Sequence, residues 1–167
     1  NIKNKSKTVE DKIQLFDYEG LKLPLPTEIE ISESGTCNRS CSFCPRSAKD
    51  FIDKKEFITN ELHEKLCKEL QALNYKGTIR YSGFVEPMLD KNIYNLINIV
   101  KNFLPDSNVE MVTNGDPLNL KRLEKLFQSG LNRILISAYD GKEDADKLED
   151  LCKSANLSSD QYIVRHR

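Results

Sequence analysis

The chain has 167 residues, of which 38% are hydrophobic and 31% are charged, and this composition suits one globular domain with a real core. The formal net charge of −1 creates no overall basic field, so composition does not support nucleic-acid binding. The longest apolar runs, such as LINIV at 96–100, are far shorter than the roughly 20 residues that span a bilayer. We therefore expect a cytoplasmic protein with no membrane segment.

Residues 1–24 are polar at their start and show no apolar periodicity, so we predict an N-terminal arm that is partly disordered. The core domain is predicted over residues 25–167. Within it, five short segments rich in β-branched or aromatic residues predict strands. They are TEIEIS at 27–32, TIRYSG at 78–83, NVEMVT at 108–113, RILISA at 133–138 and QYIVRH at 161–166.

Between the strands, apolar residues recur at helical spacing and predict four helices. The first follows Thr59 as N-cap, the second follows Asp90, and the third starts at Asp116 and Pro117 and stops at Gly130. The apolar stripes are Leu62, Leu66, Leu70 and Leu73; Ile93, Leu96, Ile97 and Val100; Leu120, Leu123 and Phe127; and Ala145, Leu148, Leu151 and Cys152. Alternating strands and helices predict an α/β fold with parallel strands and right-handed crossovers.

Four of the predicted strands are followed by unusual short sequences. A cysteine-rich loop follows the first strand, and the other three are GFVEP at 83–87, TNG at 113–115 and SAYDG at 137–141. The carboxyl ends of parallel strands share one edge, where α/β proteins bind ligands, so these loops predict a single site. Taken alone, TNG and DG are equally compatible with ordinary turns.

The cysteine-rich segment SGTCNRSCSFCPRS at 34–47 has the spacing C-x3-C-x2-C, formed by Cys37, Cys41 and Cys44. In a reducing compartment such a cluster is expected to bind metal or to do redox chemistry rather than to form disulfides. Structural zinc normally has four protein ligands. A fourth ligand here would have to be His63 or His166, and each is more simply explained as a solvated or structural histidine.

A ferredoxin-type cluster would need a fourth cysteine. The two remaining cysteines, Cys67 and Cys152, fall beside leucines on predicted helix faces, where they are expected to be small buried hydrophobic residues. The remaining possibility is a [4Fe–4S] cluster with three irons held by the protein and the fourth open to an external ligand.

This motif, with Phe43 directly before the last cysteine, resembles the signature of the radical S-adenosylmethionine (SAM) enzymes, over about residues 25–167. The resemblance implies a partial (β/α) TIM-like barrel in which Cys37, Cys41 and Cys44 bind a [4Fe–4S] cluster and SAM occupies the open iron. In that family an electron from the cluster cleaves SAM to methionine and a 5′-deoxyadenosyl radical, which abstracts hydrogen from a substrate. A fourth cysteine would occupy the position that SAM needs.

GFVEP resembles the family's Gly-Gly-Glu-Pro motif, which helps to hold the SAM amino group. The resemblance therefore implies SAM-binding roles for Gly83, Glu86 and Pro87. Val85 departs from the pattern, because the family usually has glycine there. A β-branched residue resists positive φ, so either this loop has negative φ at Val85 or the motif is altered.

Other residues at the strand ends are predicted to contact SAM. The resemblance implies that Phe43 lies near the adenine and that Ser137 contacts the ribose or the carboxylate. A guanidinium suits a planar carboxylate, so Arg165 is predicted to pair with the SAM carboxylate. Thr113 and Asn114 are predicted to touch the ribose or the substrate.

The family core typically has six βα units, whereas this sequence begins with Asn and reaches only the fifth strand, so we expect a truncated chain. The resemblance implies an external reductant such as flavodoxin or ferredoxin. A partial barrel with an open side suits a large substrate, such as a peptide or a carbohydrate. Arg39 and Arg46 flank the cysteines and are expected to be solvated, with tuning of the cluster or contact with an electron donor as alternatives.

Two other classes of function stay open at this point. One is an iron–sulfur electron-transfer module that ignores SAM, and the other is a zinc-stabilised binding module. GFVEP discriminates against the first, because an electron carrier has no use for a SAM-binding loop. The near-neutral charge discriminates against a nucleic-acid-binding form of the second.

Overall fold

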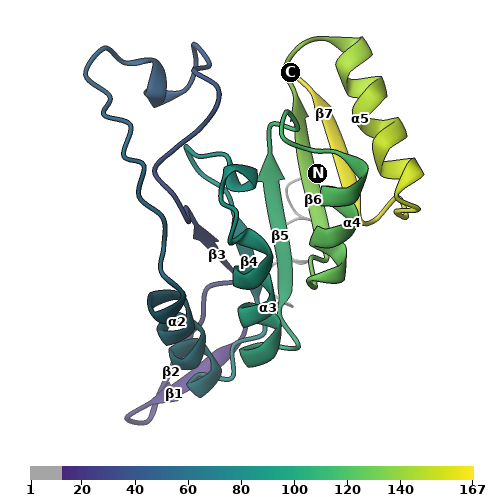
Figure 1. The fold of residues 1–167 in the computed structure, drawn as a ribbon. Helices are drawn as coiled ribbons and strands as arrows, with labels where there is room; N and C mark the ends of the chain where they lie inside the picture. The colour runs from purple at the N-terminus through teal and green to yellow at the C-terminus, as the bar shows by residue number, and fades with distance from the viewer. Residues whose placement is uncertain (1–12) are drawn as a thin grey trace, which may run out of the picture.

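The computed structural model describes residues 13–167, and the described part begins with a β-hairpin. The predicted arm over residues 1–24 therefore ends in ordered structure, and its start, where disorder was predicted, falls on residues 1–12, which lie outside the described part. Glu19 (φ 50°) and Gly20 (φ 84°) form the turn, because two left-handed residues match the twist of a tight hairpin. The two antiparallel strands are β1 (Leu15–Tyr18) and β2 (Leu21–Pro24), drawn in purple in Figure 1.

All five predicted core strands are confirmed. They pair in chain order, β3-β4-β5-β6-β7, and every neighbouring pair is parallel. This arrangement confirms the α/β fold and brings the carboxyl ends of the strands to one edge. The strands are β3 (Glu28–Ile31), β4 (Thr78–Tyr81), β5 (Asn108–Thr113), β6 (Arg133–Ala138) and β7 (Tyr162–His166).

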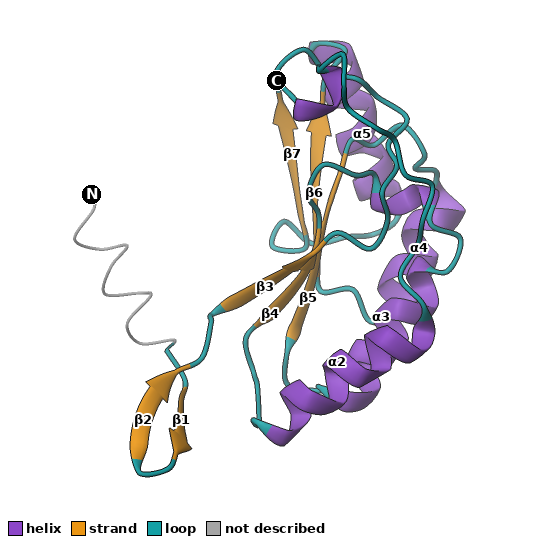
Figure 2. Cartoon of the chain, turned by 90° about the vertical axis from the view of Figure 1, so that its left-hand side faces the viewer, coloured by secondary structure: helices purple, strands orange, loops and turns teal. Residues whose placement is uncertain are grey.

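The two faces of this sheet differ, because successive side chains of a strand point to opposite sides. Ile79, Val109 and Ile134 are fully buried on the face that the helices cover. Arg80 and Glu110 alternate with them and point to the other face, over which no described helix lies (Figure 2). The described chain is thus a sheet with one covered face and one open, charged face.

Four helices cover the first face, and among the described residues none is long and apolar enough to cross a bilayer. The Thr59 cap is confirmed, since its hydroxyl accepts a hydrogen bond from the backbone N–H of Leu62 at 3.2 Å. Gly130 (φ 104°) follows the third helix, as predicted. The helices are α2 (Asn60–Ala72), α3 (Ile93–Phe103), α4 (Leu120–Gln128) and α5 (Lys142–Ser154).

Two predicted helix starts are wrong. Asn92 and not Asp90 is the N-cap of α3, and the Asp90 carboxylate instead accepts from the backbone N–H of Asn92 at 2.7 Å. The α4 helix begins after Asn119, whose side chain accepts from Arg122 N–H at 3.0 Å, and not at Asp116. The Asp116 carboxylate is engaged by a distant arginine, so a tertiary contact overrides the local capping signal.

The buried face of α2 is also rotated from the predicted leucine stripe. His63, Cys67 and Leu70 are buried, whereas Leu62 is 58% exposed. His63 Nε2 lies 2.6 Å from the Tyr81 hydroxyl, so this histidine is satisfied inside the core and is not a zinc ligand. Cys67, like Cys152 in α5, is a buried thiol, and burial raises the pKa of both to about 11.

Candidate functional site

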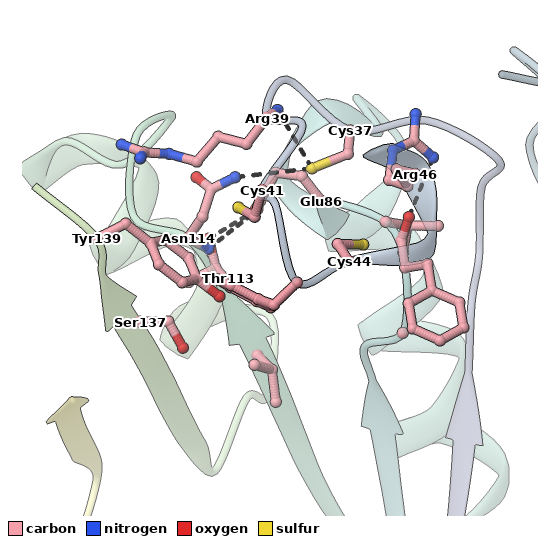
Figure 3. A pocket seen from close by; sticks show the side chains of 15 residues that line it. Cys37, Arg39, Cys41, Cys44, Arg46, Glu86, Thr113, Asn114, Ser137 and Tyr139 are labelled. Atoms are coloured by element: carbon pink, nitrogen blue, oxygen red, sulfur yellow. Dashed lines mark hydrogen bonds between the residues drawn. The ribbon is translucent and has the colours of Figure 1, made fainter. Parts of the chain in front are cut away.

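The three motif cysteines line one cavity of about 230 Å³ at the carboxyl edge of the sheet. They lie on the loop after β3, and the opposite wall is formed by the ends of β4, β5 and β6 (Figure 3). The four loops that the sequence assigned to one site therefore do meet. Besides the cysteines, the lining comprises Arg39, Phe43, Arg46, Gly83, Phe84, Val85, Glu86, Val112, Thr113, Asn114, Ser137 and Tyr139.

The donor set of this cavity suits an iron–sulfur cluster. Cys37, Cys41 and Cys44 are free and partly buried, and the three are spread along the cavity wall. Among residues 13–167, no three Cys, His, Asp or Glu side chains converge on one point as ligands of a single ion would. Three free cysteines that line one cavity are the ligand type that binds iron–sulfur clusters.

Cys37 is the most constrained of the three thiols. Its sulfur accepts from the backbone N–H of Arg39 at 3.4 Å and lies 3.9 Å from the Asn114 side-chain amide. Burial raises the pKa of Cys37, and a metal bound to its sulfur would favour the thiolate form.

Glu86 lies under the cavity, and only 1% of its surface is exposed. Its carboxylate accepts three hydrogen bonds: from Met88 N–H at 3.0 Å, from the Thr113 hydroxyl at 2.7 Å and from Asn114 N–H at 2.7 Å. Burial raises the pKa of Glu86, while these donors oppose the rise by stabilising the carboxylate. Glu86 thus connects the loop after β4 to the end of β5, and the Thr113 hydroxyl faces Glu86 as its donor.

The backbone of the GFVEP loop shows how Val85 fits where the family usually has glycine. The positive φ of this loop belongs to Gly83 (φ 121°), and Val85 is not among the described residues with positive φ. A Cβ on Gly83 would lie 2.1 Å from the Ser32 hydroxyl oxygen, so only glycine fits there. Pro87 starts a short 3₁₀ helix, η2 (Pro87–Leu89), capped by the Glu86 side chain. Val85 is therefore accommodated because the φ angle at its own position is negative.

The remaining predicted SAM residues divide between two cavities. Ser137 is buried in the wall of the first cavity, and Phe43 is 70% exposed with its ring centroid 5.7 Å from that of Tyr139. Arg165 does not line this cavity. It lines a second one of about 360 Å³ on the open sheet face, although it pairs in register with Ser137, and Val112 lines both cavities.

The expectation that Arg39 and Arg46 are solvated is wrong. The Arg46 side chain is 7% exposed, pairs with Asp53, and donates to the carbonyl oxygens of Gly35 (3.2 Å) and Phe84 (3.1 Å). The Arg39 guanidinium is also shielded, at 19% exposure, and pairs with two aspartates from other loops. The two arginines attach the cysteine loop to opposite sides of the site.

Two residues at or near the site were not predicted from the sequence. Tyr139 lines the cavity, and its position two residues after Ser137, at the end of the same strand, is the only signal that could have found it. Glu33 is 1% exposed and follows β3 by two residues. Nothing in the sequence marks Glu33 as buried, since acidic residues also occur at exposed positions of the same strand.

Known proteins resemble the chain both in sequence and in fold. It is 29% identical to the S-adenosyl-L-methionine-dependent 2-deoxy-scyllo-inosamine dehydrogenase of Niallia circulans, over 68% of this chain and 45% of that one. It is 32% identical to a probable GTP 3′,8-cyclase of Pyrococcus horikoshii, over 66% of this chain and 34% of that one. The chain thus spans less than half the length of these curated relatives.

Among solved structures, BtrN in complex with AdoMet and 2-DOIA matches with a TM-score of 0.72 and 23% identity, over 86% of this chain and 57% of that one. Methylornithine synthase (PylB) matches with a TM-score of 0.59 and 20% identity, over 83% and 43%. These likenesses confirm the predicted partial-barrel fold. The sequence profile of the Radical SAM superfamily matches residues 31–163, which include the cysteine motif and all four strand-end loops. The chain therefore belongs to the radical SAM superfamily, whose members use a [4Fe–4S] cluster and S-adenosylmethionine.

Proposed function

We propose that this chain is the cluster-binding and SAM-binding part of a radical SAM enzyme. The observation that carries the proposal is that three thiols spaced C-x3-C-x2-C line one cavity whose other walls are the ends of β4, β5 and β6. Cys37, Cys41 and Cys44 hold three irons of the cluster. When bound, the cluster and SAM supply a 5′-deoxyadenosyl radical that removes hydrogen from a substrate.

The GFVEP loop is proposed to bind the SAM amino group through its backbone, with Glu86 fixing its shape. Since the Glu86 carboxylate already accepts three hydrogen bonds, its role is to hold the loop against β5. Gly83 and Pro87 set the path of that loop at its two ends. Thr113 and Asn114 support it by donating to Glu86, and they also line the cavity, where contact with ribose or substrate is predicted.

Further contacts with SAM are proposed around the cavity mouth. Phe43 lies beside Tyr139, so its exposed ring is available to an adenine. Ser137 lines the wall beyond it, and Arg165, one strand away in register, is proposed to meet the SAM carboxylate.

The partners of the whole protein also belong to this proposal. Chemistry of this kind needs an electron, so a flavodoxin or ferredoxin is proposed as the reductant. A peptide or a carbohydrate is proposed as the substrate, because the sheet face beside the cavity is open (Figure 2). A cytoplasmic location remains a prediction.

The test is low-temperature electron paramagnetic resonance of the anaerobically reconstituted, dithionite-reduced chain, with and without SAM. We expect a reduced [4Fe–4S] signal that changes when SAM is added. A signal indifferent to SAM would favour an electron-transfer module, and stoichiometric zinc without iron would overturn the proposal.

Cysteine variants sharpen this test. Cys41→Ala is expected to abolish retention of the full cluster, whereas Cys67→Ala is expected to leave it intact, because Cys67 is buried in α2 beside His63. Iron and sulfide per chain after desalting measure the difference. A Cys41→Ala protein that retains a full cluster would refute the ligand assignment.

A further inference from the structure

Arg39, between Cys37 and Cys41, connects the cysteine loop to the ends of two other strands. Its Nε donates to Asp116, after β5, at 2.7 Å. Its two terminal nitrogens donate to Asp140, after β6, at 3.0 and 2.6 Å. A guanidinium shared by two carboxylates has its planar donors used in fixed directions, which a lysine ammonium cannot reproduce.

The neighbouring residue extends this connection toward the SAM-binding loop. The Asn38 side chain donates to Asp116 at 2.7 Å and accepts from the Asn114 amide at 2.8 Å. The backbone N–H of Asn114 in turn donates to Glu86 at 2.7 Å. A continuous series of hydrogen bonds therefore runs from Arg39 to Glu86.

The second half of the cysteine loop is held differently. Arg46, just after Cys44, binds the carbonyl oxygens of Gly35 and Phe84 on the β3 and β4 side. The start of the Cys37 half is also held by the main chain, because Glu86 N–H donates to the carbonyl oxygen of Thr36 at 3.0 Å. Arg39 holds the segment after Cys37, and its guanidinium lies 5.4 Å from the centroid of the Tyr139 ring in the cavity wall. Loss of Arg39 should therefore loosen the segment between Cys37 and Cys41, while Thr36 and the Cys44 half stay in place.

We propose that Arg39 is a positioning residue that, through Asp116 and Asp140, fixes the side of Cys37 that the hydrogen bond between Glu86 and Thr36 does not hold. Its effect on the cluster rests on the proposed function, but its effect on the loop does not. Arg39→Gln removes the guanidinium, and Arg39→Lys keeps the charge without the paired donors. Asp140→Asn removes one carboxylate at a position outside the lining of the cysteine cavity.

Arg80→Gln is the matched control. Arg80 also lies between two carboxylates, Glu28 at 2.6 Å and Glu110 at 2.7 Å, but on the open sheet face and outside the lining of the cysteine cavity. It reports what the loss of such a bridge does to stability alone.

The first measurement uses the cluster-free chain, in which alkylation of each cysteine by iodoacetamide is followed by peptide mapping. Because exposed and half-exposed ion pairs are individually weak, we expect Cys37 to react roughly fivefold faster in Arg39→Gln, with Cys44 unchanged. In Arg39→Lys, the rate of Cys37 alkylation should lie between those of the wild type and Arg39→Gln. When Arg39→Gln is combined with Asp140→Asn, Cys37 should react no faster than in Arg39→Gln alone. Unchanged Cys37 reactivity, or an equal rise in Arg80→Gln, would overturn the proposal.

The second measurement follows the reconstituted cluster. Residues that orient metal ligands typically change metal affinity by about tenfold or more, so Arg39→Gln should lose iron about tenfold faster to a chelator and show a shifted resonance spectrum. Arg80→Gln should match the wild type in both. If the wild-type chain bound no cluster, the proposed function would fail, while the alkylation result would still decide the role of Arg39 in the loop. A wild-type spectrum and iron retention in Arg39→Gln would refute its role toward the cluster.

Discussion

Two glutamates, Glu86 and Glu33, are buried to the same degree near the carboxyl edge of the sheet, yet their surroundings are opposite. Each is 1% exposed. Both oxygens of Glu86 accept hydrogen bonds, from three donors in all. Glu33 accepts from the Ser34 hydroxyl at 3.1 Å through one oxygen, and its other oxygen, Oε2, has no partner among the described residues.

The ionisation of the two carboxyls follows from this difference. Burial raises the pKa of both, but at Glu33 it is opposed weakly, and the pKa reaches about 7. Repulsion from the carboxylates of Asp90 and Glu86 is a smaller contribution to the same rise. Glu86 is organised to be an anion that fixes a loop, whereas Glu33 is partly protonated at neutral pH. Burial alone therefore does not set the ionisation of a buried carboxyl group, and the number of donors aimed at it matters as well.

The largest expected effect comes from removing the well-satisfied carboxylate. Glu86→Ala would leave three buried donors without an acceptor, so we expect the free energy of unfolding of the cluster-free chain to fall by about 4 kcal/mol. Urea unfolding measures the loss, and Glu124→Ala on the exposed surface of α4 is the control.

If Glu86→Ala does not fold, Glu86→Gln retains one acceptor oxygen and turns an amide group toward a donor, with an expected loss of about 2 kcal/mol. A loss no larger than that of Glu124→Ala would show that the Glu86 hydrogen bonds contribute little.

The contribution of Glu33 to the free energy of unfolding is expected to depend on pH. Its folded-state pKa of about 7 lies above the ordinary value of 4.5, so the folded chain binds this proton more tightly than the unfolded chain. The stability that this provides is fully present below about pH 4.5 and is lost as pH rises to about 7, a change of about 3 kcal/mol. Glutamine cannot ionise, so Glu33→Gln should gain stability relative to the wild type across that range. Parallel unfolding profiles of the two proteins between pH 4.5 and 8 would contradict this.

The smallest expected effects come from the hydroxyl groups that serve each glutamate. Thr113→Val removes the donor to Glu86 and the acceptor of Gly115 N–H, and should cost about 2 kcal/mol. Ser34→Ala removes one bond to Glu33 and should cost about 1 kcal/mol. Because that bond lowers the pKa of Glu33, Ser34→Ala should also move the loss of stability to higher pH. Denaturant unfolding at several pH values measures the loss for each of the two variants. A larger loss of unfolding free energy in Ser34→Ala than in Thr113→Val would contradict the comparison.

Much of the fold was predictable because the local spacing of apolar residues indicates where strands and helices form. The five core strands, the four helices and their parallel order follow from short β-branched segments alternating with apolar stripes. The same spacing did not predict the exact buried face of every helix. In α2 the core accepts His63 because Tyr81, on a strand 18 residues away, provides its hydrogen bond.

The sequence by itself determined the cysteine motif, the strand-end loops and their meeting at one edge, because a parallel sheet brings every carboxyl end to the same side. Only the tertiary structure decided which arginines are shielded, where Arg165 lies and that one oxygen of Glu33 has no partner among the described residues. Arg39 and Asp140, for example, are 101 residues apart in the chain. Contacts of this kind leave no periodic trace in the sequence, since they depend on the relative placement of loops that are far apart until the sheet has formed.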